Sequence, residues 1–348
     1  MTMALTLNDK EKLLRLRQIF NRNYRLTKIY SEYLNRFPEL ITGEMIAALT
    51  EDGDIAPSDA LSAIIAEAFA LDLEESIEDR KLYRDYIIPS VRTLDPQRYY
   101  SNPYWKKMKD ITDGEGKWEI KSEEYPAYRA VVCDDVIIND DFSEIVPLGF
   151  FPESFDFLAV LEDSNEWMTL TPVDLDTCEE AIRESFGKVI TFGLGLGYYT
   201  YMVAEKPEVE SVTVVEISEE AISLFKKNIL PRFSHPEKVK IVKADAFDYA
   251  EHDMPKEHYD VAFVDTWRDA SDGAPMYLKM KRCEKLNTGT RFIYWIENFL
   301  ISRLRCLRFE EMWQAYEDGR FSDMPESYEA ICRELTKEAL SEHKFTNL

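Results

Sequence analysis

The sequence predicts an α/β protein built on a doubly wound, mainly parallel sheet, with a helical N-terminal region, a small β-rich segment and a helical C-terminal extension. Two observations support this prediction. Between residues 188 and 296, apolar strand-like runs alternate with helical segments, and this alternation is typical of parallel strands with helices on both faces. The first run also enters a glycine-rich loop, as the first strand of such sheets often does. We expect four parts: residues 1–110, 111–171, 172–298 and 299–348.

Composition limits the classes of partner. The chain has 348 residues, of which 45% are hydrophobic and 31% charged. This hydrophobic content is enough for a substantial core and is higher than that of disordered chains. Acidic side chains outnumber basic ones by 66 to 42, so the net charge is −24. Because such a surface repels phosphate backbones and anionic lipid headgroups, we expect neither nucleic acid nor a membrane as partner.

Cysteine spacing and hydropathy indicate the compartment. The five cysteines contain no C-x-x-C pair, and they are Cys133, Cys178, Cys283, Cys306 and Cys332. This spacing predicts neither a zinc site nor a disulfide framework. The longest uncharged stretch, residues 189–204, is shorter than the roughly 20 apolar residues of a membrane-spanning helix. The first residues turn charged before a signal segment forms, so we expect a reduced, soluble, cytoplasmic protein.

The N-terminal part has helical periodicity. Apolar residues recur three or four apart over residues 8–37, and two more helices are expected after Pro57 and over residues 72–88. The first 37 residues contain eight basic and three acidic side chains. This basic helix is either a docking arm or a helix packed on the acidic body or on a partner subunit; we favour the packed helix, which would suit a homodimer.

The segment that follows has the pattern of short strands. Runs rich in β-branched and aromatic residues occupy residues 118–121, 128–132 and 136–138. Residues 155–161 and 167–171 predict a hairpin with a five-residue loop at 162–166. No residue of this segment indicates a particular chemistry.

The third part carries the alternation. We expect strands at 188–192, 211–216, 239–243, 259–265 and 291–296, and helices at 198–204 and after Ser218, a preferred N-cap residue. Beyond Asn298, helices are expected at 299–316 and 325–343. Parallel sheets of this kind bind ligands at the carboxyl ends of their strands.

A glycine loop and three carboxylates occupy those strand ends. Gly193, Gly195 and Gly197 form G-x-G-x-G after the first strand, where glycine permits a tight turn and close approach of a ligand. Glu216 ends the second strand and Asp245 follows the third. A carboxylate at the first position can accept both hydroxyls of a ribose, and one at the second can accept the amine of adenine. The fourth strand ends at Asp265, so four strand ends face one crevice.

Each of these features has a simpler interpretation. The loop can be a tight turn, and Glu216 and Asp245 can each cap the helix that follows. The nicotinamide-cofactor pattern G-x-G-x-x-G fails, because its third glycine falls on Tyr198. We favour one binding site over the structural interpretation because all four features occur in the right order.

Residues 171–298 resemble the core of class I S-adenosylmethionine-dependent methyltransferases, a Rossmann-like fold. The runs K-V-K-I-V-K-A-D-A-F-D-Y and Y-D-V-A-F-V-D are similar to the spermidine synthase branch of that superfamily. The resemblance implies S-adenosylmethionine as cofactor and a small-molecule methyl acceptor. It places the three glycines at the methionine part and Asp265 at the mouth where the substrate enters. It implies that the ribose and adenine ends are bound by Glu216, Ile217, Asp245 and Ala246.

The chain also departs from the family pattern. Thr191 stands two positions before the first glycine, where the family usually has an acidic residue. Aminopropyltransferases have aspartate at the position of Leu196, and D-S-S-D where this chain has D-T-W-R-D from Asp265 to Asp269. These differences argue against aminopropyl transfer. C-terminal helices also replace the family's usual terminal β-hairpin.

Asp265 is the candidate catalytic residue, as a base or as a group that orients the acceptor. Trp267 and Tyr294 are either an aromatic wall near the sulfonium or ordinary core residues. Asp265, Glu297 and Asn298 are similar to a catechol-type Mg²⁺ set, an alternative that we favour less than a metal-free site. Two further hypotheses stay open: an aminopropyltransferase and a non-catalytic cofactor-binding scaffold.

Overall fold

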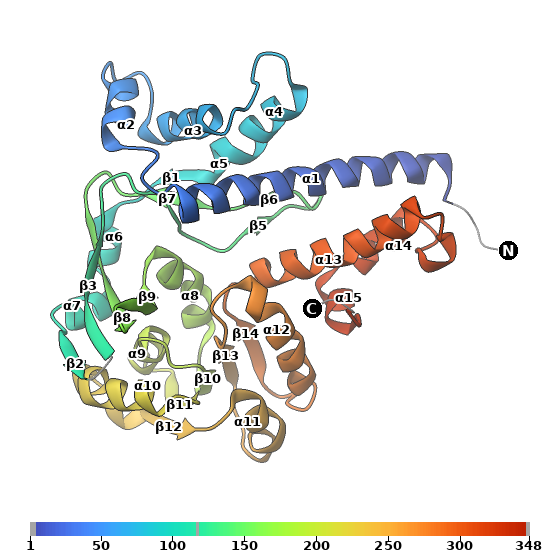
Figure 1. Ribbon diagram of the computed structural model, residues 1–348. Coiled ribbons are helices and arrows are strands. Elements are labelled where there is room, and N and C mark those ends of the chain that lie inside the picture. Colours follow the sequence, from blue (N-terminus) through green and yellow to red (C-terminus); the bar gives the residue numbers. More distant parts are fainter. Residues whose placement is uncertain (1–4, 116–117, 346–348) are drawn as a thin grey trace.

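A five-stranded parallel sheet is the centre of the C-terminal half of the chain (Figure 1). The computed structural model describes residues 5–115 and 118–345. Counting from β10, the strand order is third, second, first, fourth, fifth, and every neighbouring pair is parallel. The strands are β10 (Gly187–Phe192), β11 (Val209–Glu216), β12 (Val239–Lys243), β13 (Val261–Val264) and β14 (Arg291–Tyr294). The predicted α/β fold with a parallel sheet is confirmed, and its order reverses between β10 and β13, where sheets of this type bind ligands.

Helices cover both faces of this sheet. Successive residues of β10, Val189 and Ile190, belong to different apolar clusters, since side chains alternate between the faces of a strand. The first cluster includes residues of α8 (Pro172–Glu184), α9 (Tyr198–Ala204) and α10 (Glu219–Leu224). The second includes residues of α11 (Ala246–His252), α12 (Ala270–Glu284) and α13 (Glu297–Glu317). Short helical turns link these elements: η2 (Phe225–Ile229), η3 (Leu230–Arg232), η4 (Pro236–Lys238) and η5 (Met254–Lys256).

A second, antiparallel sheet precedes the core. Its order is β2-β3-β8-β9, formed by β2 (Asp113–Glu115), β3 (Trp118–Tyr125), β8 (Phe155–Glu162) and β9 (Asn165–Leu170). The predicted hairpin is present, but the predicted five-residue loop is wrong. Only Asp163 and Ser164 connect the strands, with φ of 49° and 67°. Two consecutive left-handed residues close a hairpin tightly, which lengthens both strands.

Two small sheets accompany this segment, and the first of them includes a strand from the N-terminal region. One has the order β1-β7-β4, with β1 (Val91–Thr93), β7 (Leu148–Phe150) and β4 (Val131–Val132); the other pairs β5 (Ile137–Ile138) with β6 (Glu144–Ile145). Because β1 lies before residue 110, the region predicted to be helical contributes a strand. The proposed domain boundaries remain predictions.

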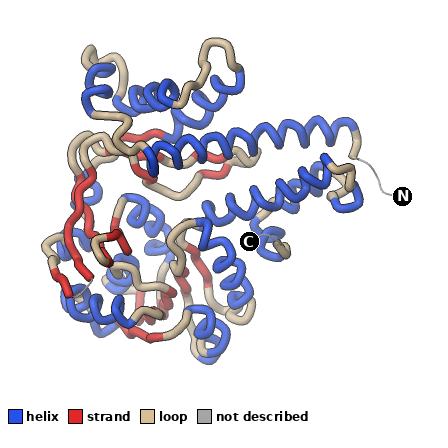
Figure 2. Tube along the Cα trace, in the orientation of Figure 1, coloured by secondary structure: helices blue, strands red, loops and turns tan. Residues whose placement is uncertain are grey.

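The N-terminal region is otherwise helical, as Figure 2 shows. The predicted helix over 72–88 begins only at Ile77, because the Asp72 carboxylate accepts the amides of Glu74 and Glu75 in a turn and Ser76 caps the helix. The helices are α1 (Leu7–Arg36), α2 (Gly43–Thr50), α3 (Pro57–Ala68), α4 (Ile77–Leu82), η1 (Tyr83–Ile87), α5 (Ile88–Ser90), α6 (Pro96–Tyr100) and α7 (Pro103–Met108).

The long helix α1 packs on the C-terminal helices (Figure 1). Its partners are α13 and α14 (Tyr328–Glu334). The C-terminal region also contains η6 (Phe321–Asp323) and α15 (Lys337–Glu342), so the single helix predicted over 325–343 is two helices, each with its own N-cap. The basic side chains of α1 pair with acidic residues of its own chain, Lys12 with Glu329 at 3.2 Å and Arg25 with Asp79 at 2.7 Å. The homodimer stays a prediction. None of the helices in the described ranges has the length and apolar character of a membrane span.

Candidate functional site

One cavity of about 620 Å³ lies at the carboxyl ends of β10 to β13. Its wall consists of the glycine loop, three strand ends, strand β9 and parts of α8 and α12, namely residues 166–169, 174, 193–196, 215–217, 244–247, 265–268, 276 and 295. Seven of the eight predicted binding residues therefore share one cavity: Gly193, Gly195, Glu216, Ile217, Asp245, Ala246 and Asp265.

The eighth residue, Gly197, is not part of the cavity lining. It is the N-cap of α9 with φ of 74°, and a Cβ there would lie 2.3 Å from the ring of Phe225. A Cβ on Gly193 would lie 1.8 Å from the carbonyl oxygen of Asp265. Packing therefore explains glycine at both positions. Gly195 differs, because a Cβ there would meet nothing within 4 Å, so this residue borders open space in the cavity.

The Glu216 carboxylate bridges two loops. One oxygen accepts the amide of Leu194 at 3.1 Å and the other accepts the amide of Ser218 at 2.7 Å. The side chain thereby holds the glycine loop against the end of β11. Since a carboxylate offers about four acceptor positions, each oxygen can still accept a ligand hydroxyl.

Asp245 is the N-cap of α11. Its Oδ1 accepts the amides of Phe247 and Asp248 at 2.9 and 3.0 Å, as the capping interpretation of the sequence predicted. Its other oxygen accepts no hydrogen bond from the described residues. Ile217 and Ala246, the neighbours of the two carboxylates, line the cavity, and Ile217 is exposed.

Asp265 has a different environment. Its backbone amide donates to Phe192 at 2.8 Å, but its carboxylate accepts no hydrogen bond from residues 5–115 or 118–345. Burial, with smaller contributions from Asp174 and Glu216, raises the pKa of Asp265 to about 8. Asp174, in the first turn of α8, faces the same cavity. No sequence pattern indicated that Asp174 would lie in this cavity.

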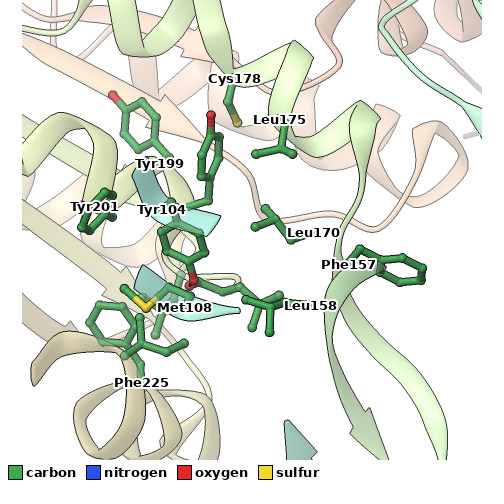
Figure 3. Packing of buried hydrophobic residues seen from close by; sticks show 14 of the residues in the cluster. Tyr104, Met108, Phe157, Leu158, Leu170, Leu175, Cys178, Tyr199, Tyr201 and Phe225 are labelled. Carbon is green, nitrogen blue, oxygen red and sulfur yellow. Dashed lines mark hydrogen bonds between the residues drawn. The ribbon is translucent and has the colours of Figure 1, made fainter. Parts of the chain in front are cut away.

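Helix α7 fixes the glycine loop from outside the core. The buried Tyr104 hydroxyl donates to the carbonyl oxygen of Leu196, and Asn102 donates to the hydroxyl of Tyr198 at 3.1 Å. Figure 3 shows Tyr104 within the apolar cluster that also contains Tyr201 and Phe225. The sequence pattern of α7 did not indicate that this helix would support the glycine loop, because Tyr104 and Leu196 are 92 residues apart in the chain.

Aromatic side chains form much of the wall. Trp167, Trp267, Trp295 and Phe247 line the cavity. The predicted partner of Trp267, Tyr294, does not; it stacks on Trp267 with centroids 6.5 Å apart and donates to Glu284 at 2.7 Å. The core interpretation therefore holds for Tyr294.

The structure separates the alternative Mg²⁺ set. Glu297 accepts hydrogen bonds from Tyr277 at 2.9 Å and Lys337 at 2.6 Å, while the Asn298 side chain donates to the carbonyl oxygen of Val136. Neither lines the cavity with Asp265. Within the described ranges, no group of three or more His, Cys, Asp or Glu residues has the arrangement of a metal site.

No protein-family model matches the chain, and no curated protein matches it. Solved structures match it in part. A precorrin-8w decarboxylase from Methanobacterium thermoautotrophicum is 24% identical over 39% of this chain and 64% of its own, with a TM-score of 0.26. A dimethyladenosine transferase from Plasmodium falciparum is 21% identical over 26% and 30%, with a TM-score of 0.20. Spermidine synthase from Thermotoga maritima is 15% identical over 57% and 62%, with a TM-score of 0.30. Each match spans less than two thirds of the solved chain.

Proposed function

We propose that this protein is an S-adenosylmethionine-dependent methyltransferase that acts on a small molecule. The observation that supports this most is the convergence of the glycine loop, Glu216, Asp245 and Asp265 on one cavity. These groups come from four strand ends in the order that the resemblance implies. A cavity of about 620 Å³ also leaves room for an acceptor beside the cofactor.

The residues present fit the cofactor. Gly195 borders open space, so the loop can approach the amino-acid end closely. Each Glu216 oxygen accepts one backbone amide and retains capacity for a ribose hydroxyl. Asp245 uses one oxygen for the helix cap, which leaves the other for the amine of adenine.

Methyl transfer requires that the acceptor be aligned with the methyl group and that one proton be removed from the acceptor. S-adenosylmethionine supplies an already activated methyl group on its sulfonium. The protein holds the acceptor in line with that group, beside the aromatic side chains of Trp167, Trp267 and Trp295 that line the cavity. Asp265 takes the proton that the acceptor loses. Its pKa of about 8 gives the carboxylate useful basicity near neutral pH.

Calorimetric titration with S-adenosylmethionine, S-adenosylhomocysteine and decarboxylated S-adenosylmethionine tests this function. We expect micromolar binding of the first two and a loss of about tenfold or more in Glu216→Gln, because the variant weakens both ribose contacts. Glu219→Gln is the matched control, since Glu219 lies three residues further along the chain, is exposed, and pairs with Lys243.

The remaining outcomes separate the rival hypotheses. Binding of only the decarboxylated form would replace methyl transfer by aminopropyl transfer. Binding of none of the three would contradict the proposal and favour the non-catalytic scaffold.

A further inference from the structure

The cavity extends beyond the part that the cofactor would occupy. Its wall includes the carboxyl ends of β12, β11, β10 and β13 and the residue that follows β14. Since neighbouring strands lie about 4.8 Å apart, the edge of the sheet from β12 to β14 is about 19 Å wide. Glu216, Asp245 and the glycine loop lie at the ends of β10 to β12, so the proposed function leaves the β13–β14 end for the acceptor.

Two tryptophans line the cavity from elements outside the cofactor's half of the sheet. Trp295 follows β14, and Trp167 lies in β9 of the antiparallel sheet. Strand β9 leads through Thr171 into α8, and the indole N–H of Trp295 donates to the hydroxyl of Thr177 on α8 at 2.8 Å. Helix α8 therefore supports both tryptophans, one through the chain and one through a hydrogen bond.

The backbone of β9 is irregular at Trp167. The pairing of β9 with β8 shifts between Glu166 and Met168, so Trp167 is an extra residue with no opposite residue on β8. Such a β-bulge bends a strand and changes the direction of a side chain. All four residues 166–169 line the cavity, and the Trp167 indole packs edge-on against Trp118, with centroids 4.4 Å apart. The bulge and this packing hold the indole in the cavity wall.

A second irregularity follows Trp295. Ile296 has φ of 47° and ψ of 39°, a left-handed conformation that β-branched residues rarely adopt. It turns the chain from β14 into α13, while the amide of Trp295 still donates to the carbonyl oxygen of Val264 at 2.9 Å. Strained backbone of this kind persists only where the surrounding structure holds it, and it is common at binding sites. This turn and the bond to Thr177 fix the Trp295 indole before a ligand binds.

The other side chains near these tryptophans favour a flat, uncharged ligand. Among the described residues of the wall, Arg268 is the one basic residue, and Met168 and Trp267 add apolar surface. A guanidinium plane and an indole both stack on aromatic rings, and methionine makes favourable contacts with ring edges. The charge of Arg268 disfavours a cation beside it, and the carboxylates of Asp174 and Asp265 disfavour an anion.

We propose that Trp167 and Trp295 bind the planar, neutral aromatic ring of the methyl acceptor. The ring lies at the β13–β14 end of the cavity, where its hydroxyl or amine substituent is beside Asp265. A saturated ring of the same size has no π-face to stack on an indole, so the site discriminates against it. The role of the ring as acceptor rests on the proposed function, whereas the stacking of an aromatic ligand on the two tryptophans does not.

Two alcohols with the same carbon skeleton test this inference. 2-Naphthol is planar and aromatic, whereas decahydro-2-naphthol is saturated and puckered. Calorimetry compares both alcohols, and tetramethylammonium as a cationic probe, with and without S-adenosylhomocysteine, in the wild type, Trp167→Leu and Trp295→Leu. Trp105→Leu is the matched control, because Trp105 is also partly buried, stacks on Tyr100 and does not line the cavity.

The wild type should bind 2-naphthol about tenfold more tightly than decahydro-2-naphthol, and each Leu variant should reduce this preference to about threefold or less. Burial of apolar surface alone gives no such preference, because the saturated skeleton is at least as apolar. Affinity for S-adenosylhomocysteine should change by less than about twofold in all variants, and Trp105→Leu should keep the ring preference. Equal binding of the two alcohols, or a preference that both Leu variants retain, would overturn the inference. Tighter binding of tetramethylammonium than of 2-naphthol would overturn it in favour of a cation site.

The outcomes separate this inference from the proposed function. If S-adenosylhomocysteine binds and the two alcohols bind alike, the inference fails and the cofactor site stands. If S-adenosylhomocysteine does not bind but the ring preference depends on both tryptophans, the proposed function fails and the aromatic site stands. The comparison of the alcohols in the wild type decides the inference even where a Leu variant unfolds. Trp167→Phe and Trp295→Phe keep a ring and should restore most of the preference.

Discussion

The two sides of the cavity satisfy their carboxylates differently. On the β11–β12 side, Glu216 and Asp245 each accept two backbone amides from neighbouring loops or helix turns. On the α8–β13 side, the Asp265 carboxylate accepts no hydrogen bond from the described residues, and Asp174 accepts its two bonds from Thr171 on one oxygen. On the first side, backbone amides therefore hold both carboxylates in place. On the second side, the Asp265 carboxylate has no such support among the described residues.

The two sides therefore differ in how rigidly their carboxylates are held before a ligand binds. Backbone amides fix the orientation of Glu216 and Asp245 before any ligand enters, so these carboxylates can define a rigid nucleoside pocket. The Asp265 carboxylate instead raises the free energy of the folded protein when it is ionised, because a desolvated charge without a hydrogen bond from the described residues costs stability. Four substitutions test this contrast.

The largest effect is expected where the two sides meet. In Gly193→Ala, the new Cβ would lie 1.8 Å from the carbonyl oxygen of Asp265, at a residue with φ of 96°. Because the backbone of Gly193 or Asp265 must shift to relieve this contact, we expect a loss of about 3 kcal/mol or more in the free energy of unfolding, measured by urea denaturation. Gly195→Ala is the control, with open space around it and an expected cost of about 1 kcal/mol for its backbone conformation. Equal losses would contradict the close contact between β10 and β13.

Asp265→Asn tests the unfavourable charge. The folded-state pKa of about 8 lies above the model value of 3.8, so the folded protein binds this proton more tightly than the unfolded chain does. Stability from this group is present at low pH and is lost as the pH rises through 8. At pH 9 the variant should therefore be more stable than the wild type, on the order of 2–5 kcal/mol, since one pKa unit is about 1.4 kcal/mol.

Thermal melts from pH 5 to pH 9 measure this effect. The melting temperatures of wild type and variant should diverge as the pH rises. Parallel pH profiles would show that burial does not disfavour the ionised form of Asp265. Glu216→Gln should show no comparable gain, because its carboxylate is already hydrogen bonded.

Tyr104→Phe tests how the N-terminal region supports the glycine loop. The variant leaves the carbonyl oxygen of Leu196 without its donor. We therefore expect a loss of about 1–2 kcal/mol in the free energy of unfolding and several-fold weaker binding of S-adenosylhomocysteine. Tyr201→Phe is the control, because Tyr201 packs on Tyr104 with centroids 5.4 Å apart and its hydroxyl makes no hydrogen bond to described residues. If the two variants behave alike, the hydroxyl of Tyr104 does not position the loop.

The smallest effect separates the two roles of Asp245. Asp245→Ala removes the cap of α11, which should cost about 1 kcal/mol, whereas Asp245→Ser keeps a capping oxygen and loses less. If the other oxygen binds the amine of adenine, both variants should lower the preference for S-adenosylhomocysteine over its inosine analogue, measured by calorimetry. A stability loss with an unchanged preference would leave Asp245 only as a cap.

Local patterns predicted the parallel sheet and the residues of the cavity wall that follow its strands. The positions of Glu216, Asp245 and Asp265 could be inferred because a strand end is recognisable from apolar runs and the carboxyl ends of parallel strands meet at one edge. The hairpin length was wrong because left-handed residues at Asp163 and Ser164 are not encoded by the usual Asn-Gly pair.

Long-range contacts explain what could not be predicted. Asp174 reads as an ordinary helix-capping residue, since its capping box with Thr171 is local, and only the packing of α8 on the core brings it to Asp265. Tyr104 reads as a core aromatic. Gly197 has the same sequence signal as Gly195, yet its neighbour is the ring of Phe225.

A crystal structure of the protein with S-adenosylhomocysteine would decide whether this cavity binds the cofactor. We expect ribose hydroxyls on Glu216, the adenine amine on the second oxygen of Asp245 and the amino-acid end along Gly193 and Gly195. An empty cavity at saturating ligand, or ligand bound elsewhere on the protein, would contradict the proposed function.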